Sequence, residues 1–188
     1  TVNEVINGLL GVPLPTSMQA VTIGAIPPLA VVPGGSANVF ARSLGIEADP
    51  VAATNQLIGL LDARARRTIG LGHSGNRWFT FNAGMGLDAD VCRAIDASRK
   101  DGKPVSATRY LRSAVQEFFK HKRRPARLTV EVPGQDPFEG VHYAFVSNSS
   151  PWTYLNERPV HTNPGTGFDS GLGVFGMRST ALFPTLRV

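Results

Sequence analysis

The 188-residue sequence predicts an α/β segment followed by a β-rich, sandwich-type domain with inserted helices. Over residues 1–67 the pattern reads helix, short apolar run, glycine-rich loop, helix and helix, an order typical of one side of an α/β domain. From residue 68 onwards, short runs of β-forming residues alternate with turns. The 20 Gly and 14 Pro residues also indicate many turns rather than a helical bundle. We therefore expect residues 1–67 to be the C-terminal part of an α/β domain and residues 68–188 to be an incomplete β-sandwich domain.

The first helix is predicted over residues 1–10. Its apolar residues recur with the three- and four-residue spacing of a buried helix face. Thr1 and Glu4 have the spacing of a capping box, in which each side chain bonds the backbone N–H of the other residue. Gly11 and Pro13 are expected to end the helix, because glycine suits the position after the last turn and proline cannot continue it.

A strand, a loop and two helices are predicted next. Residues 29–32 (Leu-Ala-Val-Val) form a short apolar run typical of a buried parallel strand. Residues 33–38 turn the chain directly into a helix over residues 39–44. A third helix is predicted over residues 50–63, because Asp49 is a good N-cap and a proline follows it in the first turn.

The second part is predicted to contain five strands and two helices. A β-hairpin is expected where two β-forming runs flank a short turn at residues 74–77, and two later strands are expected to pair across a Pro-Gly-Gln-Asp turn. The five strands are predicted over residues 68–73, 78–82, 128–132, 141–147 and 172–177. The two helices are predicted near residues 88–98 and over residues 106–121, the second with a strong apolar face.

The formal charge of +5 is concentrated in one segment. Residues 109–127 carry seven Lys or Arg side chains against one acidic residue, Glu117, so the rest of the chain is close to neutral. Five of these basic residues form a patch at residues 120–127, which a solvated helix end explains most simply, with contact to anionic lipid or to nucleic acid as the alternatives. Residues 120–127 lack the interleaved aromatic residues of a nucleic-acid surface, so we expect no nucleic-acid partner.

The composition excludes several other classes of protein. Residues 5–41 carry no charged side chain, but five prolines break this stretch too finely for a membrane-spanning helix. Cys92 is the single cysteine, which rules out a disulfide scaffold and a zinc ribbon and favours a reducing compartment. The four histidines show no metal-ligand spacing, and no Gly-x-Ser-x-Gly motif supports a serine hydrolase.

The glycine-rich loop at residues 33–38 is the strongest candidate site. Glycines let a backbone approach a ligand closely, and free N–H groups ahead of a helix attract phosphate. A tight turn with Ser36 or Asn38 as the helix N-cap explains the same residues equally well. The loop is neither a Walker loop, because no Lys-Ser/Thr pair follows, nor a GxGxxG fingerprint.

Three other positions leave a structural and a functional interpretation open. Asn3 is the residue in the first helical turn that capping does not explain. Asn82 ends a strand ahead of a glycine-rich stretch, and Asp88 after it is favoured as a helix N-cap, with a site-lining role for both as the alternative. Asp169 lies in a glycine-rich turn, where an isolated Asp usually bonds its own backbone and a cation would need further oxygens.

Taken together and in this order, three motifs resemble those of the diacylglycerol kinase catalytic family, which includes bacterial lipid kinases and sphingosine kinases. Residues 1–8 (Thr-Val-Asn-Glu-Val-Ile-Asn-Gly) resemble the continuation of its Gly-Gly-Asp-Gly-Thr-x-Asn-Glu motif. Residues 33–42 (Pro-Gly-Gly-Ser-Ala-Asn-Val-Phe-Ala-Arg) resemble its second nucleotide loop, Pro-x-Gly-Thr-x-Asn-Asp-x-Ala-Arg. Residues 82–89 (Asn-Ala-Gly-Met-Gly-Leu-Asp-Ala) are similar to its Asn-x-x-Gly-x-Gly-x-Asp-Ala segment.

The resemblance implies an ATP-binding α/β domain followed by a β-sandwich domain, with the nucleotide bound between them. It implies that the two phosphate loops contain Thr1, Val2, Asn3, Gly34, Gly35, Ser36 and Asn38. Ser36 stands where the family usually has Thr, and Val39 replaces its usual Asp. Residues 168–172 resemble a turn that holds a structural magnesium in some members, and here Asp169 is the expected ligand, because Ser170 replaces a second Asp.

The implied function is that of an ATP- and Mg²⁺-dependent lipid kinase that phosphorylates a lipid hydroxyl, such as that of diacylglycerol. Such an enzyme is expected in the cytoplasm, peripherally at the inner membrane surface, where the basic patch would meet anionic headgroups. The family's Gly-Gly-Asp-Gly run and its late acidic base motif fall outside the sequence, so no catalytic residue is assigned and the chain alone is expected to be an inactive fragment. The alternative is a non-catalytic nucleotide-binding or scaffolding protein of the same fold. The sequence specifies neither the lipid nor the oligomeric state.

Overall fold

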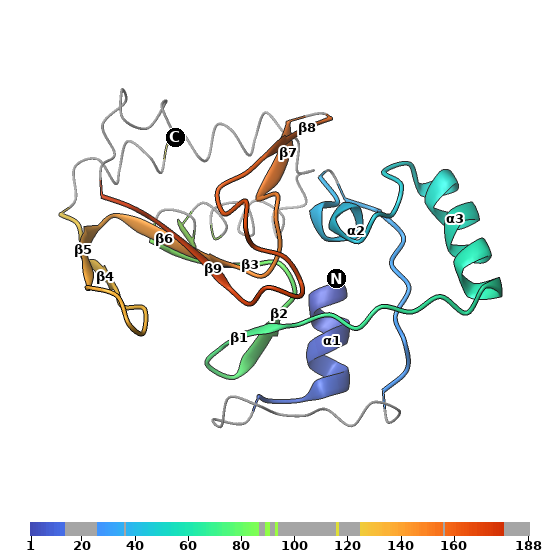
Figure 1. Cartoon of the computed structure of the whole chain (residues 1–188), viewed down its shortest axis with the longest axis horizontal. Helices are drawn as coiled ribbons and strands as arrows, with labels where there is room; N and C mark the ends of the chain where they lie inside the picture. The colour runs from blue at the N-terminus through green and yellow to red at the C-terminus, as the bar shows by residue number, and fades with distance from the viewer. Residues whose placement is uncertain are drawn as a thin grey trace. The chain divides into compact units, whose positions relative to one another are not determined.

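The computed structural model describes residues 1–13, 26–35, 37–86, 89–90, 93, 116, 125–155 and 157–178. These residues contain the predicted mixture of helices and β-strands (Figure 1). The chain forms two compact units, one of Thr1–Asn82 with Ser147–Gly173, the other of Ala83–Val146 with Val174–Val188. The predicted domain boundary between residues 67 and 68 stays a prediction.

The first unit contains three helices close to their predicted positions. Helix α1 spans Val2–Leu10 with Thr1 as N-cap and Gly11 as C-cap. Helix α2 spans Val39–Ser43, and helix α3 spans Pro50–Asp62. The Asp49 side chain caps α3 by accepting hydrogen bonds from two backbone N–H groups of its first turn, as the sequence predicts.

The apolar faces of α2 and α3 pack on one another. The buried centre of this packing consists of Ala41, Ile46 and Ala53, with Leu57 of α3 against it. Val31 lies against the same cluster, so the apolar run at residues 29–32 contributes to the core through one side chain.

The prediction of a parallel strand over residues 29–32 is wrong. These residues form no strand, and no described strand pairs with them. Leu29 and Val32 are about half exposed, at 45% and 51%. A short apolar run becomes a parallel strand only when a neighbouring strand satisfies its backbone groups, and the described part of the chain supplies none.

Two antiparallel hairpins complete the first unit. The predicted hairpin is confirmed but is shorter, with β1 at Gly72–Ser74 and β2 at Arg77–Phe79. A second hairpin, β7 at Thr153–Leu155 with β8 at Arg158–Val160, was not anticipated from the sequence. Its strands of three residues are too short to show a clear alternation of apolar and polar side chains.

The second unit contains a three-stranded sheet in which β6, Tyr143–Ser147, lies between β3, Asn82–Gly86, and β9, Gly173–Met177. A Cβ on Gly86 would lie 2.4 Å from the carbonyl oxygen of His142, which explains a glycine where these chains approach. The predicted strand over residues 172–177 is confirmed.

A separate two-stranded sheet in this unit corrects the predicted strand pairing. Strand β4, Leu128–Val130, pairs with β5, Phe138–Val141, so Val141 is the one residue of the predicted 141–147 strand that lies opposite β4. The chain changes sheets after Val141, because the backbone N–H of His142 donates to the Met177 carbonyl. Residues 141–147 therefore do not continue one strand, although their sequence is uniformly β-forming.

Several predictions concern residues outside the described ranges. The helices expected near residues 88–98 and over 106–121 lie almost wholly outside them, as do Asp88, Cys92 and most of the basic patch. None of the helices in the described part of the chain has the length and apolar character needed to cross a bilayer.

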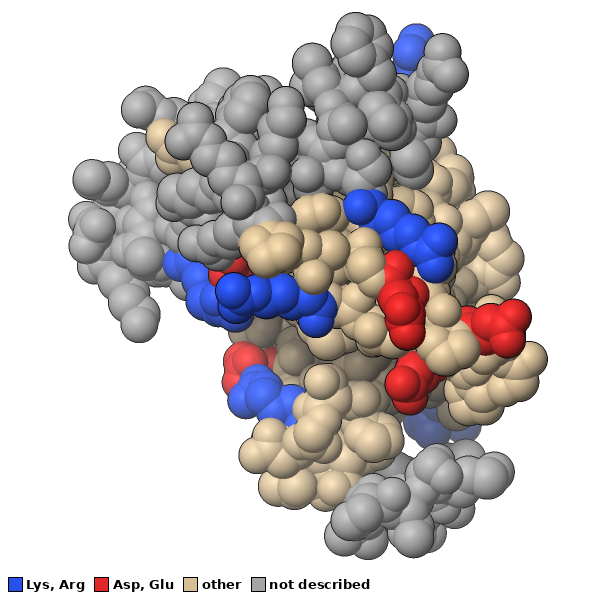
Figure 2. All heavy atoms as spheres, turned by 90° about the vertical axis from the view of Figure 1, so that its left-hand side faces the viewer, with Lys and Arg blue, Asp and Glu red and all other residues tan. Residues whose placement is uncertain are grey.

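Charges of both signs occur together on the described surface. Figure 2 shows one face on which Lys and Arg side chains lie beside Asp and Glu side chains. In the first unit, for example, the Arg42 guanidinium lies 3.4 Å from the centroid of the Tyr154 ring and 3.2 Å from a Glu157 carboxylate oxygen.

Candidate functional site

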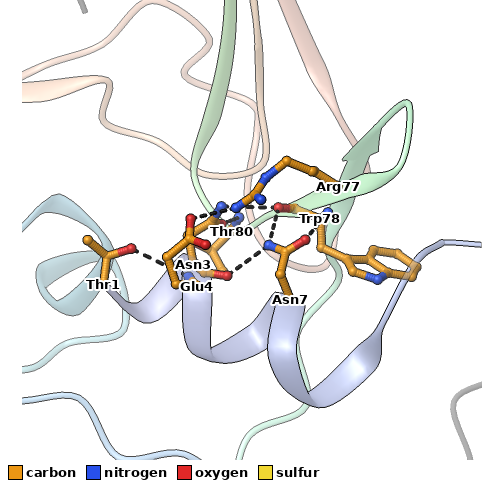
Figure 3. Close-up of polar contacts among 7 residues, drawn as sticks. All are labelled: Thr1, Asn3, Glu4, Asn7, Arg77, Trp78 and Thr80. Atoms are coloured by element: carbon orange, nitrogen blue, oxygen red, sulfur yellow. Dashed lines mark hydrogen bonds and ion pairs between the residues drawn. The ribbon is translucent and has the colours of Figure 1, made fainter. Parts of the chain in front are cut away.

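Two asparagines fasten α1 to strand β2, and Figure 3 shows both side chains directed at that strand. The Asn3 amide donates to the Trp78 carbonyl at 3.1 Å and accepts from the Thr80 N–H at 3.2 Å. The Asn7 amide donates to the same carbonyl at 2.9 Å and accepts from the Trp78 N–H at 2.9 Å. Each side-chain amide thus both donates to and accepts from the part-buried backbone of residues 78–80, in the manner of an added strand.

Asn3 is therefore explained by the fold, whereas Asn7 is a residue that the sequence analysis missed. Asn7 also donates to the Asn3 carbonyl at 2.8 Å. The signal that was present is the four-residue spacing of two asparagines, which places them on one face of a helix.

The predicted capping box is half formed. Thr1 Oγ1 accepts a hydrogen bond from the Glu4 N–H at 3.4 Å. The Glu4 carboxylate does not return to Thr1 and instead pairs with Arg77 on β2. The hydrogen bond and the positive charge of Arg77 lower the pKa of Glu4 from its ordinary value. The first turn of α1, with Thr1, Val2 and Asn3, is thereby held against the hairpin.

The glycine loop is closed by Asn38. Its side-chain oxygen accepts from the Gly35 N–H at 2.7 Å, and its amide nitrogen donates to the Gly35 carbonyl at 2.8 Å. Asn38 has a left-handed backbone with φ of 48°, a conformation that asparagine tolerates better than most residues. Asn38 is the N-cap residue of α2, one of the two residues predicted for that position, but its side chain makes no capping hydrogen bond and binds Gly35 instead; Ser36, the other predicted cap, lies outside the described residues.

The surrounding fold does not require glycine at position 34. A Cβ at this position would meet no atom within 4 Å, and the backbone is not in the left-handed region. Its immediate surroundings are open, so this stretch of backbone is accessible to a ligand. Gly35 is more constrained, because a Cβ there would lie 3.2 Å from the Asn38 side-chain oxygen.

The first turn of α1 and the helix after the glycine loop are close in space. Val2 of α1 and Phe40 of α2 line one cavity of about 230 Å³. Apart from Arg67, every residue lining this cavity is apolar. The structure therefore brings the two predicted phosphate segments into one unit, and the cavity itself is too apolar for phosphate.

Asn82 begins β3 and has buried amide atoms. Neither its side-chain oxygen nor its side-chain nitrogen has a hydrogen-bond partner among the described residues. The hydroxyl of Ser149, a residue that is only 2% exposed, also has no hydrogen-bond partner among them. Buried polar groups without partners are uncommon in folded proteins, so these call for water or a ligand. Both interpretations of Asn82 stay predictions, because water would satisfy these atoms as well as a ligand.

Asp169 is engaged by a cationic side chain. Its carboxylate lies 2.7 Å from the guanidinium of Arg67. The neighbouring Ser170 hydroxyl turns to the Gly167 backbone, accepting from its N–H at 2.6 Å. Among the described residues, no group of three His, Cys, Asp or Glu side chains gathers to hold a metal ion. The surroundings of Asp169 therefore do not fit a divalent cation.

Comparison with known proteins agrees with the motifs. Residues 1–68 match the family model of the diacylglycerol kinase catalytic domain. A crystal structure of a "putative diacylglycerol kinase from Bacillus anthracis str. Sterne" has a TM-score of 0.60 to this chain, with 21% identity over 98% of it. This chain covers 52% of that protein and so spans about half its length. No curated protein sequence matches the chain. The resemblance to the diacylglycerol kinase catalytic family is thus confirmed, over residues 1–68 by the family model and in fold by the solved structure.

Proposed function

We propose that this chain contributes the second nucleotide loop of an ATP-dependent lipid kinase, which transfers the γ-phosphoryl group of ATP to a lipid hydroxyl such as that of diacylglycerol. The observation that carries this proposal is the family match over residues 1–68, which include both predicted phosphate segments. The shared cavity lining of Val2 and Phe40 supports it further, because a single nucleotide would need both segments nearby.

In this proposal the loop backbone holds the phosphates. The N–H groups around Gly34 and Ser36 would donate to phosphate oxygens, with Asn38 fixing the loop through Gly35. Thr1, Val2 and Asn3 would place the start of α1 near the same phosphates, with the Asn3 side chain acting through the hairpin contacts that hold this helix. A divalent cation such as Mg²⁺ that arrives with ATP would neutralise the phosphate oxygens during transfer.

The reaction forms a bond between the lipid hydroxyl oxygen and the γ-phosphorus and breaks the bond between that phosphorus and the ADP oxygen. The hydroxyl proton passes to a base, and we assign this base to none of the described residues. The lipid substrate lies in a membrane, so the enzyme would work as a peripheral protein at the inner membrane surface. The basic patch at residues 120–127 is the proposed contact with anionic lipid.

The glycine loop can be tested with a substitution that the fold tolerates. Gly34→Ala adds one methyl group where no atom lies within 4 Å, so stability should stay unchanged. If phosphates approach this backbone, ATP affinity should fall about fivefold or more, measured by isothermal titration calorimetry. Gly165→Ala is the matched control, because a Cβ there also meets nothing within 4 Å. Equal ATP affinity in Gly34→Ala and wild type would reject the loop as the phosphate site.

Lipid phosphorylation separates the kinase from its alternative. The chain, expected to be inactive alone, is incubated beside the full-length protein with labelled ATP, Mg²⁺ and vesicles containing diacylglycerol, and labelled lipid is counted. If the full-length protein binds ATP but forms no labelled lipid, the non-catalytic nucleotide-binding protein is favoured. Co-sedimentation with vesicles tests the membrane contact, which should increase with the anionic lipid content.

A further inference from the structure

The turn at residues 167–171 is held by a dense set of contacts within the first unit. Phe168 is 6% exposed, and its ring meets the Phe40 ring edge-on with centroids 5.6 Å apart. The Phe168 carbonyl accepts from the Gly70 N–H at 3.0 Å. The guanidinium of Arg67 lies 5.5 Å from the centroid of the Phe168 ring. One residue of the turn is therefore buried between α2 and the segment that follows α3.

Arg67 also neutralises the acidic residue of this turn. Its Nη2 atom lies 2.7 Å from Asp169 Oδ2, a short distance for a charge-assisted hydrogen bond. Both side chains are more than half exposed, at 51% and 72%, so the pair is screened by solvent. The same guanidinium thus contacts the carboxylate and faces the buried aromatic ring next to it.

Ser170 takes no part in a cation site. Its hydroxyl accepts from the Gly167 N–H at 2.6 Å and donates to the Gly167 carbonyl at 3.1 Å, which closes the turn on itself. Magnesium is held in proteins by one or two carboxylates together with waters, and the only carboxylate of this turn is already paired with a cation. A divalent ion there would also lie close to the guanidinium charge, which repels it.

We infer that Arg67 does at this turn what a divalent cation would otherwise do: it neutralises Asp169 and ties the turn to the segment after α3, so that the turn folds without metal. This inference does not depend on the proposed kinase activity, because it concerns only the contacts that hold residues 167–171.

Thermal unfolding with and without metal tests the inference. The melting temperature of the wild-type chain should be the same in Mg²⁺ and in EDTA. Arg67→Met, which keeps the length of the side chain and removes its charge, should lower it by about 1–3 °C in both solutions. Asp169→Asn should have a similar effect, and the double variant should lose no more than either single variant, because the two residues act as a pair. Arg67→Lys, which keeps the positive charge, should lower the melting temperature less than Arg67→Met does.

A paramagnetic probe gives a second readout. Mn²⁺ added to the wild-type chain should leave the backbone amide signals of residues 167–171 as sharp as those of the β7–β8 hairpin. Two results would overturn the inference: selective broadening of the turn signals by Mn²⁺, or a wild-type melting temperature that rises with Mg²⁺ and loses that rise in Asp169→Asn. Both measurements are made without ATP or lipid, so they are unaffected if the proposed function fails.

Discussion

The first turn of α1 and the loop at residues 33–38 are the two predicted phosphate segments, and the fold makes different demands on them. In α1 the side-chain amide of Asn3 both donates to the Trp78 carbonyl and accepts from the Thr80 N–H. In the loop, Gly34 meets no neighbour that would exclude a side chain, and its backbone angle does not demand glycine. The identity of Asn3 is thus accounted for by structure, whereas the identity of Gly34 is not.

This difference shows where a functional role can be separated from a structural one. A substitution at Asn3 would disturb both folding and any ligand, so its effect on ATP would be hard to interpret. A substitution at Gly34 leaves the described contacts intact and reports on the ligand alone. Asn38 lies between these cases, because its side chain makes two hydrogen bonds to Gly35 that shape the loop.

The largest effect is expected where α1 meets β2. Asn7→Ala removes three hydrogen bonds and leaves the Trp78 N–H without its partner, which should cost about 2–3 kcal/mol of unfolding free energy. Urea unfolding measures the loss. Asn7→Asp is the matched control, because it keeps the acceptor for the Trp78 N–H and removes only the donor, so it should cost less. Equal costs for the two variants would mean that the accepted bond contributes little.

A smaller effect is expected from opening the glycine loop. Asn38→Ala removes both bonds to Gly35 and places alanine in a left-handed backbone, for an expected cost of about 1–2 kcal/mol. Asn38→Gly removes the same bonds but adopts this backbone freely, so it should cost less than half as much. The two variants are compared by urea unfolding. If glycine is as costly as alanine, the side-chain bonds rather than the backbone conformation dominate.

The smallest effect is a pH dependence at the exposed pair of Glu4 and Arg77. Because Arg77 lowers the pKa of Glu4 in the folded state, the pair stabilises the protein above the ordinary carboxyl range and loses this contribution as the pH falls through the folded value. Arg77→Met should therefore lower the urea midpoint slightly at pH 7 and by less at pH 3. A difference of equal size at both pH values would indicate lost packing of the Arg77 side chain instead.

Much of the local structure could be predicted because it depends on neighbours in the sequence. Thr1 and Asp49 begin their helices with side-chain caps that act within three residues. The turn at residues 74–77 brings β1 and β2 together, so the hairpin needed no distant information. The motif at residues 33–42 likewise identified the glycine loop, whose resemblance to a kinase family the family model supports.

The predictions that were wrong or incomplete involve residues whose partners are distant in the sequence. Residues 29–32 have the composition of a strand but no described strand beside them, and residues 141–147 divide between two sheets at His142. Arg67 and Asp169 are separated by 102 positions, so the sequence could show a turn with one carboxylate but not the guanidinium that pairs with it. No local pattern encodes such contacts.

The sequence by itself determined where the helices of the first unit begin and end, where its first hairpin turns, and which family its motifs resemble, because caps, turns and motifs act over a few residues. Only the tertiary structure decided the roles of individual polar side chains. Asn3 binds the strand backbone, Asn38 closes a loop and Asp169 meets an arginine, because hydrogen-bonding groups are satisfied by whichever partners folding brings within about 3 Å.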